Sequence, residues 1–160
     1  MKGIFITFEG IDGCGKSTQC ELLKDYLKDN NKDFIFVREP GGTVIGERIR
    51  EILLDKKNTQ MNSRTELLLF EAARAQITEE VIKPALDEGK IVLCDRFFDS
   101  SSAYQGMARN MGMNFVAGLN MAATGGLKPD VTFFFDISVE EALARTAEAV
   151  RLYADRKDTE

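Results

Sequence analysis

The chain has 160 residues, and 21 Lys and Arg residues against 26 Asp and Glu residues give it a formal net charge of −5. This length fits a single domain, and the acidic balance argues against a nucleic acid or an anionic membrane surface as a partner. The sequence contains no histidine, which excludes Ser-His-Asp and Cys-His catalysis and HExxH zinc chemistry.

Four short apolar runs, each rich in β-branched or aromatic residues, are separated by longer stretches with helical spacing. They are residues 3–9, 33–39, 90–95 and 130–137. Strands that are apolar along their whole length are typical of a parallel sheet buried on both faces. The sequence therefore predicts an α/β fold in which helices cover both faces of a parallel sheet.

Two helix starts are marked by polar residues. Ser63 with Glu66, and Ser138 with Glu141, fit the S-x-x-E capping box. The helix after Ser63 is expected to end near Pro84, because proline removes a helix hydrogen bond.

The sequence after the helix that begins near Ser138 is strongly charged and stops without another strand. A doubly wound sheet usually continues at that point. We therefore expect residues 1–160 to form one incomplete domain, from which the last strand and the C-terminal helices are absent.

The three cysteines, Cys14, Cys20 and Cys94, are odd in number and have no C-x-x-C spacing. This favours free thiols in a reducing cytosol over a disulfide framework or a zinc site. The first residues are interrupted by charge too soon for a signal peptide, and no apolar run reaches membrane-spanning length. We therefore expect a cytoplasmic protein.

The segment GIDGCGKS, residues 10–17, matches the pattern G-x-x-x-x-G-K-[ST] between a predicted strand and a predicted helix. Glycines allow the backbone to turn its N–H groups around a phosphate, and the helix N-terminus attracts the same anion. Lys16 can reach the outer phosphates, and Ser17 offers a hydroxyl group to Mg²⁺. The alternative is a glycine-rich turn with a surface lysine. The strand and helix context favours a nucleotide-binding loop, and phosphoryl transfer needs no histidine.

Two motifs of a regulatory GTPase are missing from the sequence. The predicted strand at 90–95 is not followed by D-x-x-G, and Asn31-Lys32-Asp33-Phe34 lacks the final Asp of N-K-x-D. A regulatory GTPase is therefore disfavoured.

Side chains at helical spacing are candidates for binding a planar base. Phe70 and Arg74 are four residues apart on the long helix, so a ring and a guanidinium group share one face. Ser101 and Gln105 have the same spacing, with Tyr104 between them. A core phenylalanine and a solvated helix start are the alternatives.

Asp95 and Arg96 stand at the carboxyl end of a predicted strand, where open α/β sheets bind ligands. Asp95 is a candidate to hold Mg²⁺ through water, and Arg96 is a candidate phosphate contact. A plain surface ion pair is the alternative.

Taken in order, these motifs resemble those of the thymidylate kinase family. The matching segments are FEGIDGCGKST, REPGGT (38–43), LLLFEAAR (67–74), DRFFDSSSAYQG (95–106) and LKPDVTFFFDI (127–137). The ordered set, rather than any one motif, carries the resemblance. It implies a P-loop nucleoside-monophosphate kinase fold. The implied reaction transfers the γ-phosphoryl group of ATP to dTMP with Mg²⁺, giving ADP and dTDP.

The resemblance also implies a role for each matching residue. ATP is bound by the loop residues Gly10, Ile11, Asp12, Gly13, Cys14, Gly15, Lys16, Ser17 and Thr18. The metal is held by Ser17 and Asp95. dTMP is bound by Glu39, Arg50, Phe70, Arg74, Arg96, Ser101, Tyr104 and Gln105. Catalysis is assigned to Lys16, Asp12, Arg96, Arg151 and Arg156.

Within the implied dTMP site, Arg50 and Arg96 are expected to grip the phosphate. Glu39 is expected near the sugar and phosphate, with a cis peptide bond to the following proline. Phe70 is expected to stack on thymine and Arg74 to bind its carbonyl group.

The rest of the implied site surrounds the base edge and the sugar. Ser101 and Gln105 are expected to contact the remaining edge of thymine. Tyr104 is expected to press against the sugar where a ribose 2′-hydroxyl would lie, which favours deoxyribose.

Gly13 stands where some family members carry an arginine in the loop. Members without it use basic residues of a mobile lid, and the segment RLYADRKDTE (151–160) is similar to part of such a lid. We expect the lid region at about 146–160. Arg151 and Arg156 are then candidates to neutralise charge on the travelling phosphoryl group. A solvated charged tail is the alternative.

The resemblance further implies a homodimer in which helices pack face to face. Two other functions stay open. One is another nucleoside or nucleotide kinase on the same scaffold, and the other is a non-catalytic nucleotide-binding module.

Overall fold

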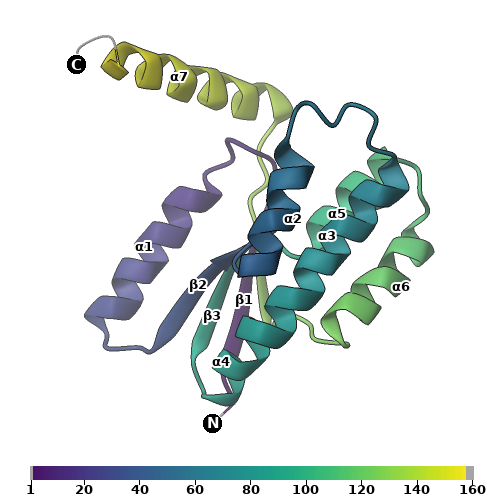
Figure 1. Ribbon diagram of the computed structural model, residues 1–160. Helices are drawn as coiled ribbons and strands as arrows, with labels where there is room; N and C mark the ends of the chain where they lie inside the picture. Colours follow the sequence, from purple (N-terminus) through teal and green to yellow (C-terminus); the bar gives the residue numbers. More distant parts are fainter. Residues whose placement is uncertain (1, 158–160) are drawn as a thin grey trace.

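The structure is a computed structural model that describes the backbone of residues 2–157 and the side chains of residues 2–148. Its strands are β1 (Ile4–Glu9), β2 (Phe34–Arg38), β3 (Ile91–Asp95) and β4 (Val131–Phe134). Its helices are α1 (Lys16–Asp29), α2 (Val44–Leu54), α3 (Ser63–Ile77), α4 (Lys83–Asp87), α5 (Phe98–Ser101), α6 (Met113–Thr124) and α7 (Val139–Lys157). Two π-helical turns are η1 (Thr78–Ile82) and η2 (Ser102–Ala108). The four strands lie where the apolar runs predicted them (Figure 1).

All four strands are parallel and lie in the order β2-β3-β1-β4. The connection after β1 runs to β2 on one side of the sheet, and the connection after β3 runs across β1 to β4 on the other side. The switch point of the topology therefore lies between the carboxyl ends of β1 and β3. Asp95, at the end of β3, is level with Phe8 of β1 and Arg38 of β2. The loops that follow these three strands therefore converge at one edge of the sheet.

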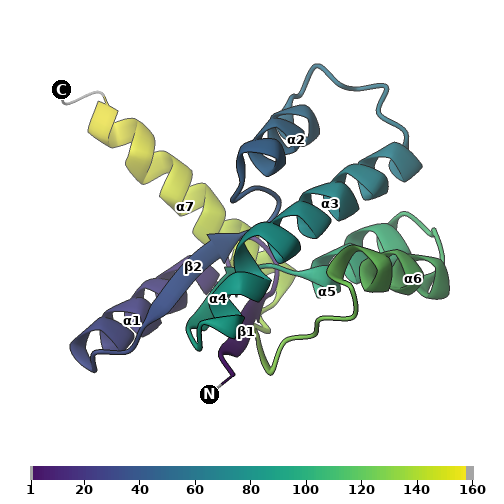
Figure 2. The same cartoon turned by 60° about the horizontal axis from the view of Figure 1, so that its bottom comes forward.

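Helices cover both faces of the sheet, as predicted (Figure 2). On the α1 face, the buried cluster contains Phe8, Cys20, Leu27 and Leu93. On the α3 and α4 face, the cluster contains Phe5, Val37, Ile77, Ile82, Ala85, Leu86, Val92, Cys94 and Phe97. Successive residues of β3 thus enter opposite layers, which explains why its sequence is apolar throughout.

The long helix differs from the prediction at both ends. Its N-cap is Asn62 rather than Ser63, because the Asn62 side chain accepts a hydrogen bond from Arg64 N at 2.9 Å. At the other end, the chain passes Pro84 through η1 and stays helical to Asp87. The shift to π-type bonding before Pro84 accommodates its missing N–H at the first turn of α4. The prediction of a helix end near Pro84 is wrong.

The second predicted capping box is half formed. Ser138 Oγ accepts a hydrogen bond from Glu141 N at 3.1 Å, so the serine does cap α7. The Glu141 side chain pairs with Arg145 one turn further along the helix instead of returning to the cap.

α7 projects away from the helices that surround the sheet (Figures 1 and 2). The predicted lid overlaps its second half. Arg151 and Arg156 fall on α7, and their side chains lie outside the described residues. Within the described part of the chain, no helix is both long enough and apolar enough to cross a membrane.

Candidate active site

The glycine-rich loop between β1 and α1 has the backbone that its sequence predicts. Gly10, Gly13 and Gly15 have φ values of 144°, 83° and 98°, and Gly15 caps α1. A Cβ atom on Gly13 would lie 2.5 Å from the carbonyl oxygen of Ala142 on α7. In this chain, both the φ value and the close approach of α7 therefore favour glycine at position 13.

Lys16 is folded into its own loop and is only 7% exposed. Its Nζ donates hydrogen bonds to the carbonyl oxygens of Gly10 at 2.9 Å and Ile11 at 3.0 Å, and contacts Cys14 Sγ at 3.7 Å. The alternative of a surface lysine on a glycine-rich turn is therefore wrong.

A cavity of about 530 Å³ opens over this loop, and we call it the loop cavity. It is lined by Asp12, Gly13, Gly15, Lys16, Ser17, Thr18, Asp95, Arg96, Arg145 and Thr146. The predicted residues Gly10, Ile11 and Cys14 stand behind it as partners of Lys16. Sequence reasoning missed Arg145, whose position at the cavity depends on where α7 begins.

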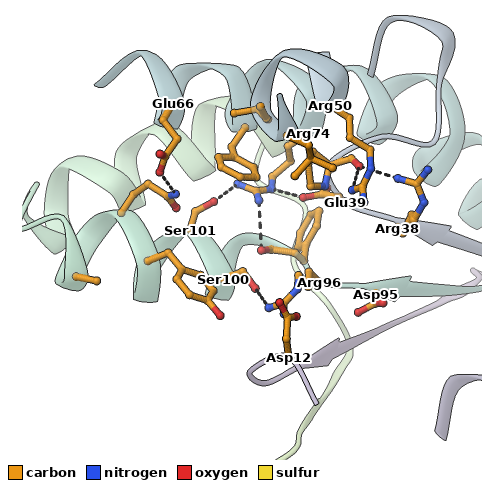
Figure 3. A pocket seen from close by; sticks show the side chains of 18 of the residues that line it. Asp12, Arg38, Glu39, Arg50, Glu66, Arg74, Asp95, Arg96, Ser100 and Ser101 are labelled. Carbon is orange, nitrogen blue, oxygen red and sulfur yellow. Dashed lines mark hydrogen bonds and ion pairs between the residues drawn. The ribbon is translucent and has the colours of Figure 1, made fainter. Parts of the chain in front are cut away.

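A larger cavity of about 670 Å³ lies beside the carboxyl ends of β2 and β3, and we call it the main cavity (Figure 3). All the residues predicted to bind dTMP line it: Glu39, Arg50, Phe70, Arg74, Arg96, Ser101, Tyr104 and Gln105. Their individual roles stay predictions. The two cavities share Asp12, Asp95 and Arg96.

Arg74 occupies the buried wall of the main cavity and is 2% exposed. Its Nε donates to Glu39 at 2.8 Å, and its Nη1 donates to Glu71 at 2.6 Å. Nη1 also reaches Ser101 Oγ at 3.0 Å and Asn120 Oδ1 at 2.9 Å. Arg74 Nη2 donates to the carbonyl oxygen of Phe97 at 3.2 Å. Most of the five N–H donors of this guanidinium group are therefore used within the protein.

Two buried carboxyl groups share this single guanidinium group. Burial raises the pKa of Glu39 to about 7, although Arg74 lowers it in part. Burial also raises the pKa of Glu71, again against the attraction of Arg74. One positive charge cannot neutralise two buried carboxylates, so a proton is retained more readily here than in water.

Arg96 joins the two cavities. The backbone of Arg96 is left-handed, with φ 69°, and its Nη2 contacts Asp12 Oδ1 at 2.6 Å. Its Nη1 donates to Ser100 Oγ at 3.1 Å, and that serine hydroxyl donates to Glu9 Oε2 at 2.7 Å. Burial lowers the pKa of Arg96, but the hydrogen bond to Asp12 and the negative charges of Tyr104, Asp12 and Asp95 together outweigh burial, so the pKa is raised. The ion pair of Arg96 is made with Asp12 rather than with the adjacent Asp95.

Two arginines meet at the carbonyl oxygen of Pro40. Arg50 Nη1 donates to it at 2.9 Å, and Arg38 Nη1 donates to it at 3.0 Å. Burial, followed by repulsion from Arg38, lowers the pKa of Arg50. The Glu39–Pro40 peptide bond is cis, as expected. Sequence reasoning passed over Arg38, although it precedes Glu39 at the end of a predicted strand.

The predicted site residues Ser101 on α5 and Gln105 on η2 are buried in the cavity wall, where other side chains hold them by hydrogen bonds. Ser101 and Gln105 are 2% and 4% exposed, so the alternative of a solvated helix start is wrong. Ser101 contacts Arg74, while Gln105 Nε2 donates to Glu66 Oε1 at 2.8 Å. The Tyr104 ring lies 5.9 Å from the guanidinium carbon of Arg96.

Asp95 and Ser17 fit a bound cation. Asp95 Oδ1 is buried and has no hydrogen-bond partner among the described residues. Ser17 lines the same loop cavity. A buried carboxylate oxygen without a donor suits a hard cation such as Mg²⁺, which takes few protein ligands and completes its shell with phosphate and water oxygens.

The raised pKa of Glu39 leads to a pH-dependent stability. Its protonated form stabilises the fold, and this contribution is complete below the ordinary value of 4.5 and lost as the pH rises through about 7. The Glu39→Gln variant lacks the titration. We expect the free energy of unfolding of the unmodified chain, minus that of Glu39→Gln, to fall between about pH 5 and about pH 8 by on the order of 1–3 kcal/mol. Denaturant unfolding measures it, and a difference that is constant or rises with pH would contradict it.

Comparisons with known proteins agree with this architecture. A family model described as thymidylate kinase matches residues 8–160. The thymidylate kinase of Thermosipho melanesiensis is 57% identical over 145 residues, which cover 91% of this chain and 71% of that protein. The thymidylate kinase of Thermoanaerobacter sp. is 52% identical over 160 residues, which cover 100% of this chain and 77% of that protein.

A solved structure extends the match to the fold. The crystal structure of thymidylate kinase from Ehrlichia chaffeensis matches with a TM-score of 0.80 and 38% identity, over 99% of this chain and 90% of that one. The expected P-loop nucleoside-monophosphate kinase fold is confirmed. Since the family model matches nearly the whole sequence and solved and curated relatives agree with it, the chain belongs to the thymidylate kinase family.

Proposed function

We propose that the chain transfers the γ-phosphoryl group of ATP to dTMP, giving ADP and dTDP. One observation carries this proposal: a phosphate-binding loop and a cavity of nucleotide size meet at Asp12, Asp95 and Arg96. A donor in one cavity and an acceptor in the other would therefore bring their phosphates together at these three side chains. In-line phosphoryl transfer requires this arrangement.

The loop cavity is proposed to hold the ATP phosphates. Backbone N–H groups around Gly13 and Gly15 and the N-terminus of α1 favour an anion there. Lys16 lies within the loop and would exchange its bonds to the Gly10 and Ile11 carbonyl oxygens for phosphate oxygens. Arg145 adds a second positive charge at the rim of the same cavity.

Mg²⁺ is proposed to bind beside Ser17 and Asp95. When bound, it neutralises charge on the phosphate oxygens. The Arg96–Asp12 ion pair fixes a guanidinium group between the two cavities, where it suits the phosphoryl group in transfer. Arg151 and Arg156 stay candidates for further charge stabilisation from α7.

The main cavity is proposed to hold dTMP. Arg38 and Arg50 converge at one end of it, where two guanidinium groups suit a phosphate. Phe70 is suited to stack on thymine, and Arg74 to donate to its carbonyl group. Tyr104, fixed beside Arg96, is suited to lie against the sugar.

A homodimer and a cytoplasmic location are also proposed. Apolar side chains are exposed on α3 and α6, among them Leu68 at 49%, Phe115 at 47% and Met121 at 51%. Pairing of these helices with a second copy would cover them. All three cysteines are free, which suits a reducing compartment.

The choice of acceptor tests the proposed reaction directly. ATP consumption is measured with dTMP, dUMP, UMP and thymidine as acceptors. We expect the highest kcat/KM with dTMP, because the cavity offers guanidinium groups for a phosphate and Tyr104 against a 2′-hydroxyl. A preference for UMP or thymidine would favour another nucleoside or nucleotide kinase. ATP binding without acceptor-dependent turnover would favour a non-catalytic module.

Replacement of Lys16 tests the loop. We expect Lys16→Ala to lower kcat by about 10²–10³, the usual effect of removing one donor to developing charge. Lys28→Ala, on the exposed side of the same helix, is the matched control. Circular dichroism verifies that both variants fold. A folded Lys16→Ala variant with a kcat near that of the control would remove Lys16 from the mechanism.

Replacement of Arg50 tests the phosphate end of the main cavity. The loss of a charge-assisted contact in Arg50→Gln should weaken dTMP binding by about 10- to 100-fold. Thymidine binding should not change, since thymidine has no phosphate. Calorimetric titration measures both, and Arg48→Gln on the exposed face of α2 serves as the control. Equal losses for dTMP and thymidine would indicate a general disturbance of the cavity instead.

A further inference from the structure

Glu66 lines the main cavity, although its spacing from Ser63 suggested a helix cap. Asn62 makes that cap, so the Glu66 carboxylate is directed elsewhere. Its Oε1 accepts a hydrogen bond from Gln105 Nε2 at 2.8 Å, and its Oε2 accepts one from Arg109 Nη2 at 3.2 Å. Glu66 therefore joins α3 to two side chains at η2, those of Gln105 and its C-cap Arg109.

This contact determines which end of the Gln105 amide meets a ligand. A carboxylate paired with a guanidinium group only accepts hydrogen bonds, so it binds the NH₂ end of an amide and repels the carbonyl end. Gln105 is 4% exposed and lines the cavity. With Nε2 held by Glu66, Oε1 is the end of the amide that is left for a ligand.

We propose that Glu66 is a positioning residue for base selection, which acts by presenting Gln105 Oε1 as a hydrogen-bond acceptor. This inference rests on the proposed function, in which a pyrimidine occupies the main cavity. Thymine and uracil carry a hydrogen at N3 and match this acceptor. Cytosine N3 carries no hydrogen and is itself an acceptor, so it cannot form a hydrogen bond with Gln105 Oε1.

Arg74 supplies the complementary donor. Its guanidinium group carries only donors, which match O4 of thymine and oppose the amino group of cytosine. Ser101 is less available to the base, because its hydroxyl group already accepts a hydrogen bond from Arg74 Nη1 at 3.0 Å. A donor from Arg74 followed by an acceptor from Gln105 matches the edge of thymine in the order O4, N3–H.

The isosteric variant Glu66→Gln tests the inference. A glutamine at this position both donates and accepts, so it leaves the Gln105 amide free to turn. We expect the ratio of kcat/KM for dTMP to that for dCMP to fall about tenfold, the scale of one oriented hydrogen bond. The ratio for dTMP to dUMP should not change, since the two bases share this edge.

The matched control is Glu79→Gln. Glu79 is also paired with a cation, Lys83, but on the surface outside the main cavity. This variant makes the same change of charge and should retain the discrimination of the unmodified chain. If Glu66→Gln does not fold, a second variant, Glu66→Asp, replaces it in the test. Glu66→Asp keeps the charge but has a shorter side chain that cannot reach Gln105, so it should also lower the ratio of kcat/KM for dTMP to that for dCMP.

A double variant separates positioning from a general structural role. If Glu66 acts through Gln105, then Glu66→Gln should cause no further loss of discrimination in a Gln105→Leu background. A folded Glu66→Gln variant that slows dTMP and dCMP alike, with an unchanged ratio, would overturn the inference.

Measurement of nucleotide binding without turnover distinguishes failure of the inference about Glu66 from failure of the proposed function. Calorimetric titration of dTMP and dCMP with the unmodified chain and Glu66→Gln measures base selection without turnover. If dTMP is not phosphorylated, the proposed function fails. A binding preference for dTMP that falls in Glu66→Gln would still support the role of Glu66, and an unchanged preference would contradict it.

Discussion

The buried Arg74 guanidinium group is the interaction on which the fold and the main cavity both depend. It links Glu39 after β2, Glu71 on α3, Ser101 on α5 and Asn120 on α6. Loss of one partner from such a buried network leaves a charge without compensation and typically costs about 3–5 kcal/mol. The helices that surround the cavity are therefore held together by a group that also lines the main cavity.

The second constraint on the candidate site is the position at which the parallel strands end. β1 and β3 are adjacent and parallel, so the residues that follow them meet at one edge. Asp12 and Arg96, 84 positions apart in the sequence, form an ion pair there. Glu9 supports this pair from within the core, because it accepts hydrogen bonds from Phe97 N at 2.7 Å and from the Ser100 hydroxyl group. The sheet topology, rather than any one loop, brings the two cavities into contact.

Sequence reasoning succeeded where the geometry is local. The phosphate-binding loop, the four strands and the shared face of Phe70 and Arg74 follow from spacing within one segment. It failed where tertiary packing decides the outcome. Glu66 matches a capping box, yet Asn62 caps the helix. Glu66 instead contacts Gln105 and Arg109, which lie 39 and 43 positions further along the sequence. Arg145 likewise reaches the loop cavity only because the first turns of α7 pack against Gly13.

Helix α3 both lines the main cavity and fixes the orientation of side chains around it. Phe70 and Arg74 face the main cavity, while Glu66 and Glu71, on the same helix, hold neighbouring side chains. Arg74 carries only donors, so its position suffices to define its chemistry. Gln105 carries a donor and an acceptor, so its chemistry depends on which end is turned inward. A neutral amide of this kind discriminates between bases only when a neighbour of fixed polarity holds it, and a carboxylate supplies that polarity.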